Sequence, residues 1–226
     1  MDIFRKTMQS AFLVAASILA SGAGTARAGF VSGLYNTGVD DSGTTQGAGA
    51  LDAHDKVVAS VDGPGTAHVV DPANLPNGWL ADSPVGSKGS MWISGPTDPI
   101  NRNDPNGPFD SQTTFKVDGT ADASTVIGGL FTGDDQVEIL LNGTVAVPFT
   151  ASHSSDRFTA FTISGGFVAG ADKINTLDFV VQNPAGGPQG VRVRMVPEPA
   201  SVAMIATGLG ATLIGSWVKR RKAATA

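Results

Sequence analysis

Apolar and polar residues alternate in short runs throughout the middle of the chain. The clearest runs are residues 115–117, 137–141, 177–181 and 191–195. A period of two is typical of a strand with one buried face. No stretch of ten or more residues within 29–196 shows the 3.6-residue apolar period of an amphipathic helix. The pattern therefore predicts an all-β body.

Gly, Pro, Asn and Asp separate the expected strands. Asn142-Gly143 lies between strands expected at 136–141 and 144–149 and suits the type I′ turn of a hairpin. Segments 36–50 and 95–110 are rich in turn residues and predict long loops. Further strands are expected at 55–61, 66–70, 90–94, 112–118, 124–131, 157–163, 175–182 and 190–196. So many short strands in residues 29–195 predict one β-sandwich of the jelly-roll type.

The first 28 residues fit a secretory signal peptide. A basic pair at 5–6 precedes an uncharged apolar run at 11–20, which is too short to span a bilayer. Ala26 and Ala28 match a small-x-small cleavage site, so signal peptidase is expected to leave Gly29 as the first residue. An amphipathic helix of the folded domain is the alternative, but the run is apolar on every side.

A second uncharged run, at 200–218, lies near the end of the chain. As a helix it would be ~28 Å long, close to the ~30 Å hydrocarbon core of a bilayer. Four basic residues follow at once: Lys219, Arg220, Arg221 and Lys222. Basic clusters stay on the cytoplasmic side of a membrane. We therefore expect an inner-membrane anchor with the body in the periplasm, rather than a buried core helix.

A short motif stands directly before this run: Val196, Pro197, Glu198, Pro199, Ala200 and Ser201. The two prolines keep the segment extended, as the cleft of a processing enzyme requires. The motif, the uncharged span and the basic cluster together (196–222) resemble the PEP-CTERM sorting signal of Gram-negative bacteria. The resemblance implies processing by a membrane exosortase, delivery to the cell surface or outside the cell, and an association with exopolysaccharide and biofilm.

A second resemblance concerns the body of the chain. Segment 128–143 (GGLFTGDDQVEILLNG) leads through an acidic turn into an alternating strand and an Asn-Gly turn. It is similar to galactose-binding-like jelly rolls, which occur as carbohydrate-binding modules and accessory domains of glycosidases. Segments 34–40, 90–95, 113–119 and 166–193 resemble parts of many PEP-CTERM ectodomains. The resemblance implies a fold and leaves the ligand open.

Composition and charge narrow the possible functions. The chain has 15 basic and 20 acidic residues, a formal net charge of −5, and basic residues concentrated at its two ends. An acidic body argues against nucleic-acid binding. The absence of cysteine excludes a disulfide scaffold, a thiolate zinc site and a cysteine nucleophile.

Residues suited to catalysis are sparse, and we assign no catalytic residue. The histidines are His54, His68 and His153, and the chain has no G-x-S-x-G, Walker A or H-E-x-x-H motif. Segment 153–156 contains the residue types of a triad, but a polar loop is the preferred interpretation. Segment 52–55 (DAHD) could offer metal ligands. A solvated turn is preferred there, because no second histidine stands at ligand spacing.

Apart from Glu138 and Glu198, every acidic residue is an aspartate. Aspartate favours turns, and many loops explain part of this bias. Aspartate also binds calcium, whose ligands are oxygen atoms from loops. A structural calcium ion is the one cofactor considered, and its candidate ligands are two adjacent pairs: Asp40, Asp41, Asp134 and Asp135.

Sugar binding commonly uses exposed aromatic rings that stack on the sugar. Trp79 and Trp92 are the first candidates. Trp79 is expected on a loop, and Trp92 is expected to point outward if Met91 and Ile93 are core. The alternative is that both tryptophans cover the rim of the core.

Two classes of function stay open. The first is a non-catalytic surface or matrix protein that interacts with exopolysaccharide. The second is a carbohydrate-active enzyme or its glycan-binding accessory module. A glycosidase needs two carboxylates about 5–10 Å apart in a cleft, and no segment of the sequence indicates such a pair. The first class is therefore favoured.

Overall fold

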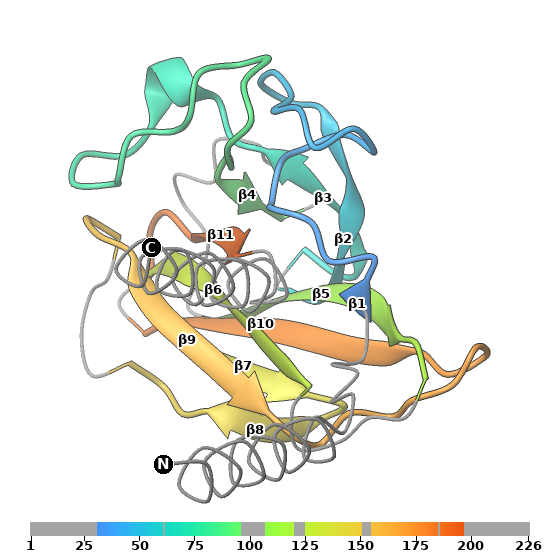
Figure 1. The fold of residues 1–226 in the computed structure, drawn as a ribbon. Helices are drawn as coiled ribbons and strands as arrows, with labels where there is room; N and C mark the ends of the chain where they lie inside the picture. Colours follow the sequence, from blue (N-terminus) through green and yellow to red (C-terminus); the bar gives the residue numbers. More distant parts are fainter. Residues whose placement is uncertain are drawn as a thin grey trace, which may run out of the picture.

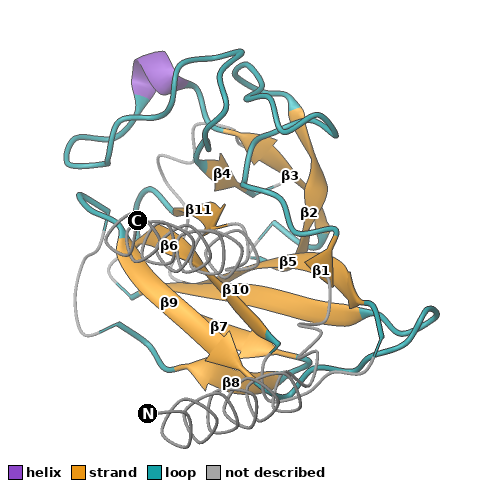
Figure 2. Ribbon diagram, in the orientation of Figure 1, coloured by secondary structure: helices purple, strands orange, loops and turns teal. Residues whose placement is uncertain are grey.

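Eleven strands, all paired antiparallel, make up the fold of the described residues (Figures 1 and 2). The computed structural model describes residues 31–60, 62–95, 107–119, 125–150, 155–184 and 186–196. In chain order the elements are β1 (Val31–Ser32), β2 (Leu51–Ala59), β3 (Gly65–Val69), the 3-10 helix η1 (Pro72–Asn74), β4 (Ile93–Ser94), β5 (Gly107–Val117), β6 (Val126–Asp134), β7 (Gln136–Leu141), β8 (Thr144–Val147), β9 (Thr159–Ser164), β10 (Asn175–Asn183) and β11 (Gly190–Val196).

The strands form one continuous sheet that bends into two facing layers. Hydrogen-bonded neighbours follow the order β8-β7-β10-β5-β2-β3-β4-β11-β6-β9, and β1 pairs with β5. β10 also contacts β6 and β11, and β8 contacts β9, so the second half of this path lies against the first. Figure 1 shows β9 and β6 crossing in front of β10 and β7. The fold is an all-β, jelly-roll-like sandwich, as the sequence predicts.

Apolar side chains from both layers fill the space between them. The rings of Phe161 on β9 and Phe179 on β10 meet edge to face, with centroids 6.0 Å apart. Each large apolar side chain that is buried contributes about 1.5–3 kcal/mol to stability. The largest buried members of this cluster are Phe109, Phe115, Phe131, Phe179, Ile93, Ile139 and Leu177.

The alternation in the sequence predicts the inward-facing residues of the central strands. On β7, the side chains of Val137, Ile139 and Leu141 are buried. The predicted hairpin at Asn142-Gly143 is also confirmed. Both residues have positive φ (52° and 75°), as a type I′ turn requires.

Segment 52–55 is a strand, and our expectation of a solvated turn is wrong. It forms the first half of β2, and Asp52 and Asp55 are both buried. The pairing of β2 with β3 is irregular between Leu51 and Lys56. Such an irregularity lets residues three positions apart face inward together.

Two other boundaries differ from expectation. β5 begins at Gly107, inside the loop expected at 95–110, and the strand expected at 90–94 consists only of Ile93–Ser94. Residues 90–92 are instead held by hydrogen bonds to neighbouring segments outside the strands. The N–H of Met91, for example, donates to the carbonyl of Thr37.

Most of the predicted targeting segments lie outside the described residues. These are the signal peptide (1–28) with its cleavage site before Gly29, residues 197–201 of the sorting motif, the span at 200–218 and the basic cluster at 219–222. Val196, the first residue of the motif, is the last residue of β11 and pairs with Gly128 on β6. Within the described ranges, no helix is long and apolar enough to cross a membrane.

Candidate functional site

Both candidate sugar-binding tryptophans are buried. Trp92 has no exposed surface, and Trp79 is 9% exposed. Their rings pack on each other, with centroids 4.0 Å apart, and form a second small core with Val70. Met91 and Ile93 are fully buried as well, so the expectation that Trp92 points outward is wrong. Residues 90–92 are not in a strand, and therefore their side chains need not alternate between two faces.

Each indole also has a hydrogen-bond partner inside the protein. The Nε1–H of Trp79 donates to the Asp134 carboxylate at 2.7 Å, and that of Trp92 donates to the Leu80 carbonyl at 2.8 Å. The Trp79 bond fixes the loop before β4 to the end of β6, and the Trp92 bond joins two parts of that loop. Neither ring has a free face for a sugar, and the structure supports the interpretation that both tryptophans belong to the core.

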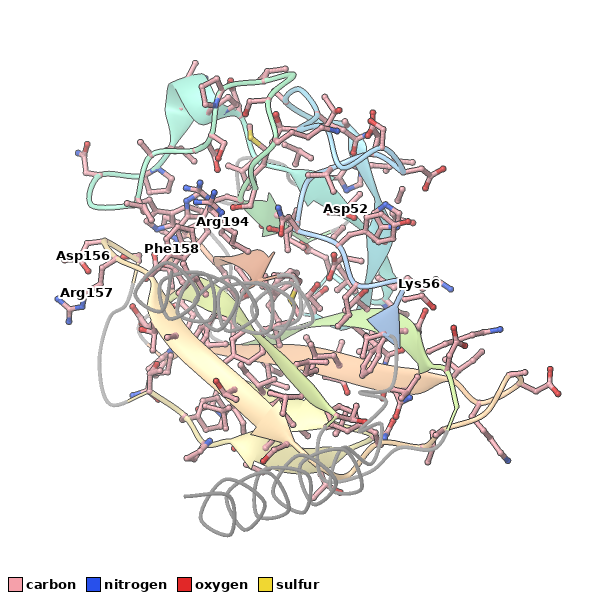
Figure 3. All side chains as sticks on the ribbon, viewed as in Figure 1. Asp52, Lys56, Asp156, Arg157, Phe158 and Arg194 are labelled. Atoms are coloured by element: carbon pink, nitrogen blue, oxygen red, sulfur yellow. The ribbon has the colours of Figure 1, made fainter. Side chains whose placement is uncertain are left out.

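A buried arginine ties the same loop to β11. The Nε–H of Arg192 donates to the Ser90 hydroxyl at 2.9 Å, and its Nη1–H donates to the Ala81 carbonyl at 2.6 Å. Asp82 lies 3.7 Å from the Arg192 Nε atom and accepts the N–H of Trp92. The Arg192 guanidinium also lies over the ring of Phe158, which Figure 3 labels in the loop before β9. These contacts are internal, so the cluster positions loops and offers no open site.

The two aspartate pairs proposed for calcium have different surroundings. One Asp40 oxygen accepts the N–H groups of Ser42 and Thr44, both at 2.9 Å, and the Ser42 hydroxyl at 2.7 Å. These bonds, the Ser42 hydroxyl first, hold the pKa of Asp40 below its usual value. Asp41 is exposed. In the second pair, Asp134 and Asp135, the Asp134 carboxylate accepts the indole N–H of Trp79. In the part of the chain that is described, no group of three or more His, Asp or Glu side chains could hold a metal ion.

β2 carries a pair of buried carboxylates. Asp52 accepts the N–H of Gly38 at 2.5 Å and the N–H groups of His54 and Asp55 at 2.8 and 3.1 Å. Asp55 accepts the Ser111 hydroxyl of β5 at 3.0 Å. Burial raises the pKa of Asp52, and burial together with the Asp52 charge raises the pKa of Asp55 well above its usual value. In Figure 3, Lys56 extends outward from the same strand.

An aromatic stack involves His54, which lies between the two carboxylates in the sequence of β2. The rings of Tyr35 and His54 lie parallel, with centroids 3.6 Å apart, and the His54 Nε2 atom is 3.6 Å from an Asp41 oxygen. The Asp52 and Asp55 carboxylates are buried and accept hydrogen bonds from groups inside the protein. The cluster therefore holds the 36–50 loop against β2, and the structure gives it no open face on which a substrate could lie.

A groove opens where the two layers meet at their free edges. β8 ends one layer and β9 ends the other, and a space of about 360 Å³ lies between them. Leu141 and Ile163 are the buried apolar residues of its lining. The rest of the lining comes from the β7–β8 hairpin, from β9 and from the two glycines after β9.

The sequence alone does not indicate this groove. Its lining residues are small or neutral, and each is ordinary in its own strand. The groove exists only because β8 and β9, which follow one another in the chain but are not hydrogen-bonded to each other, lie side by side at the edges of the sandwich. The one signal present in the sequence was the Asn142-Gly143 turn, which places β8 after β7.

Comparisons with known proteins add little. No protein-family model and no curated protein matches the chain. Among solved structures, the chain is similar to a family 35 carbohydrate-binding module from an environmental isolate. The two share 12% sequence identity with a TM-score of 0.30, and the match covers 52% of this chain and 80% of that one. A similarity this low supports no conclusion about the ligand.

Proposed function

We propose that this protein is an exported, non-catalytic surface or extracellular-matrix protein of a Gram-negative bacterium. Signal peptidase removes residues 1–28. The 200–218 span then holds the protein in the inner membrane, with the sandwich in the periplasm. An exosortase acts at the 196–201 motif, and the sandwich reaches the cell surface or the medium, where it associates with exopolysaccharide.

One observation carries this proposal, namely the order of features at residues 196–222. A Pro-Glu-Pro motif, a nineteen-residue uncharged run and four basic residues follow one another without a gap. Each feature alone is common, but together they form a segment that a membrane enzyme can hold, read and cut.

The position of the motif relative to the fold supports the proposal. β11 ends at Val196, where the motif begins, so every described strand precedes Pro197. A cut within the motif would therefore leave every described strand in the released product.

The buried acids of the sandwich support a non-catalytic role. Asp52 and Asp55 are buried and accept hydrogen bonds from groups inside the protein, and the half-buried Asp134 accepts the indole N–H of Trp79. A glycosidase instead needs a carboxylate pair that faces a cleft. The alternative, a carbohydrate-active enzyme, predicts turnover of a glycan that is lost when a specific carboxylate pair is replaced.

The test replaces Pro197, Glu198 and Pro199 together with alanine in a host that has an exosortase. We expect the processed fraction, measured by immunoblot of membrane and medium, to fall at least tenfold, because alanines allow helix and remove the charge that marks the motif. Replacing the exposed loop residue Asp156 with alanine is the matched control. An unchanged processed fraction in the triple variant would contradict the proposal.

A further inference from the structure

We propose that the groove between β8 and β9 binds a neutral glycan, one or two sugar rings at a time. This inference rests on the proposed association with exopolysaccharide and names the part of the surface that makes it. The groove's volume of about 360 Å³ is near the lower end of the roughly 300–1,000 Å³ typical of small-molecule sites. It suits a mono- or disaccharide unit of a longer polymer.

The lining of the groove combines apolar residues with hydroxyl-bearing residues, and a sugar likewise has both apolar and hydroxyl surface. A pyranose ring has apolar C–H surface as well as hydroxyl groups. Leu141 and Ile163, only 4% and 6% exposed, supply apolar surface from the two layers. Residues with hydroxyl groups line the groove on both strands: Thr144 on β8, and Thr162 and Ser164 on β9. A hydroxyl both donates and accepts, so it can pair with a sugar hydroxyl in either sense.

The charge of the lining sets the class of glycan. Among the described residues, no charged side chain lines the groove, and the whole chain has a net charge of −5. A uronic acid or sulfated sugar would lose hydration of its anionic group and gain no cation in return. Neutral sugars carry no such cost.

The edges of the sheet supply further polar groups. Among the described strands, β8 pairs only with β7, and β9 pairs only with β6. An edge strand leaves alternate N–H and C=O groups unpaired along its outer side. Such groups at the two edges are available as further partners for sugar hydroxyls.

The hairpin end of the groove is held rigid by Asn142. Its side-chain NH₂ donates to the carbonyl of Gly166 and to the Asn175 side chain, both at 3.0 Å. Its oxygen accepts the N–H of Thr176, also at 3.0 Å. These bonds fix the β7–β8 turn to β10 and to the loop after β9. When a groove is preformed, fewer protein side chains and loops have to become ordered on binding, so the entropic cost of binding a ligand is smaller.

An added peptide strand fits the same edges less well. β8 has only four residues, its pairing with β7 is irregular between Ile139 and Leu140, and Pro148 follows it. Short strands, irregular pairing and proline all hinder strand addition at a sheet edge. The observations therefore favour a sugar over a peptide.

The test titrates the full-length protein in dodecylphosphocholine micelles, whose headgroup contains no sugar, and measures binding by saturation-transfer difference NMR. The probes are maltose, cellobiose and lactose as neutral disaccharides, and digalacturonic acid as an anionic one of the same size. We expect at least one neutral disaccharide to bind at least tenfold more tightly than digalacturonic acid.

Two groove variants and one control locate the site. The double variant Thr162→Val and Ser164→Ala removes two hydroxyls from exposed positions of β9 and should weaken binding at least fivefold. Ala146→Trp fills the groove from exposed β8 and should abolish binding. Thr114→Val removes an exposed strand hydroxyl on β5, outside the groove, and should change nothing. Thermal unfolding of each variant verifies that it folds.

Several outcomes would overturn this site. They are tighter or equal binding of digalacturonic acid, no measurable binding of any neutral disaccharide, and unchanged binding in folded groove variants. Binding of an extended Val-Thr peptide in place of the sugars would also overturn it. Exosortase processing is measured for the same variants. If processing is normal but no sugar binds, the groove site alone is overturned. If processing does not change when residues 197–199 are replaced, the proposed function is contradicted.

Discussion

Individual aspartates in this protein mostly hold loops in place. Asp40 accepts the N–H groups of its own turn, Asp71 accepts the N–H of Ala73 at the start of η1, and Asp52 accepts that of Gly38. Aspartate suits these positions because its short side chain reaches nearby backbone N–H groups. The preference for Asp over Glu thus has a structural explanation at these positions.

Asp110 is an exception, because its carboxylate weakens the fold at neutral pH. Burial raises its pKa to about 6, and the neighbouring Asp178 charge adds to the shift. A folded-state pKa above the unfolded value of about 3.9 means that the folded protein binds the proton more tightly. The stability that comes from this group is therefore present below pH 4 and is lost as the pH rises through 6.

Asp110→Asn should raise the free energy of unfolding at pH 7.5 by about 1 kcal/mol, a value reduced for partial solvent screening. At pH 4 the variant and the natural protein should differ little, because the natural carboxyl is then protonated. Urea unfolding at the two pH values measures this. The exposed residue Asp118, replaced with Asn, is the control. An equal effect of Asp110→Asn at both pH values would contradict the assignment.

The burial and orientation of individual side chains were the hardest features of this protein to predict from its sequence. The burial of Asp52 and Asp55 could not be deduced, because two charged residues in a strand read as exposed unless the irregular pairing of β2 is known. Trp92 was misplaced for a related reason. Its alternation with Met91 and Ile93 has meaning only in a strand, and at that point the chain is a loop.

At the scale of the elements, β11 is packed so closely that one of its positions needs glycine. A Cβ atom on Gly190 would lie 2.9 Å from the Ile93 carbonyl oxygen and 2.8 Å from the Trp79 ring. Both distances are below any normal contact, and the carbonyl belongs to backbone that must move. β11, β4 and the Trp79 loop therefore meet at this residue.

Gly190→Ala should lower the free energy of unfolding by about 1–3 kcal/mol, the usual cost of overpacking. Gly47→Ala is the matched control, since a Cβ there meets nothing within 4 Å and its φ is not positive. Removing that glycine should be neutral or slightly stabilising. Urea unfolding followed by tryptophan fluorescence compares the two. Equal stability of both variants would show that β11 can shift away from Ile93.

The elements themselves were largely predictable. Most strands stand within a few residues of their expected places, because period-two alternation and turn residues are local signals. The order of the strands in the sheet was not predictable. The pairing of β5 with β2 and β10, for example, depends on contacts between segments far apart in sequence.

At the scale of the whole molecule, the same distinction explains which sites could be found. The proposed targeting signals are continuous motifs, so the sequence alone suggests them. The groove between β8 and β9 is lined by residues 141–166, but it forms only when these strands occupy the two edges of the sandwich, and no pattern in that segment indicates this.

A bound calcium ion would raise the stability of the whole folded protein. Its presence stays a prediction. An ion at Asp40 and Asp41, or at Asp134 and Asp135, would bind the folded state and stabilise it by mass action. EDTA should then lower the melting temperature of the full-length protein by several degrees, and excess calcium should restore it. A melting temperature that EDTA leaves unchanged, measured by scanning calorimetry with magnesium as control, would exclude the ion.

The end of β11 has a mechanical consequence. Before processing, the anchor would pull on the sandwich through Val196, the last residue of a strand that pairs with β6 along its whole length from Gly190. Antiparallel hydrogen bonds lie across the strand axis. Tension along β11 therefore loads this ladder in shear, many bonds at once, rather than opening it bond by bond. β6 in turn pairs with β9 at the groove. Drag on a captured polymer would thus reach the membrane through two adjacent ladders.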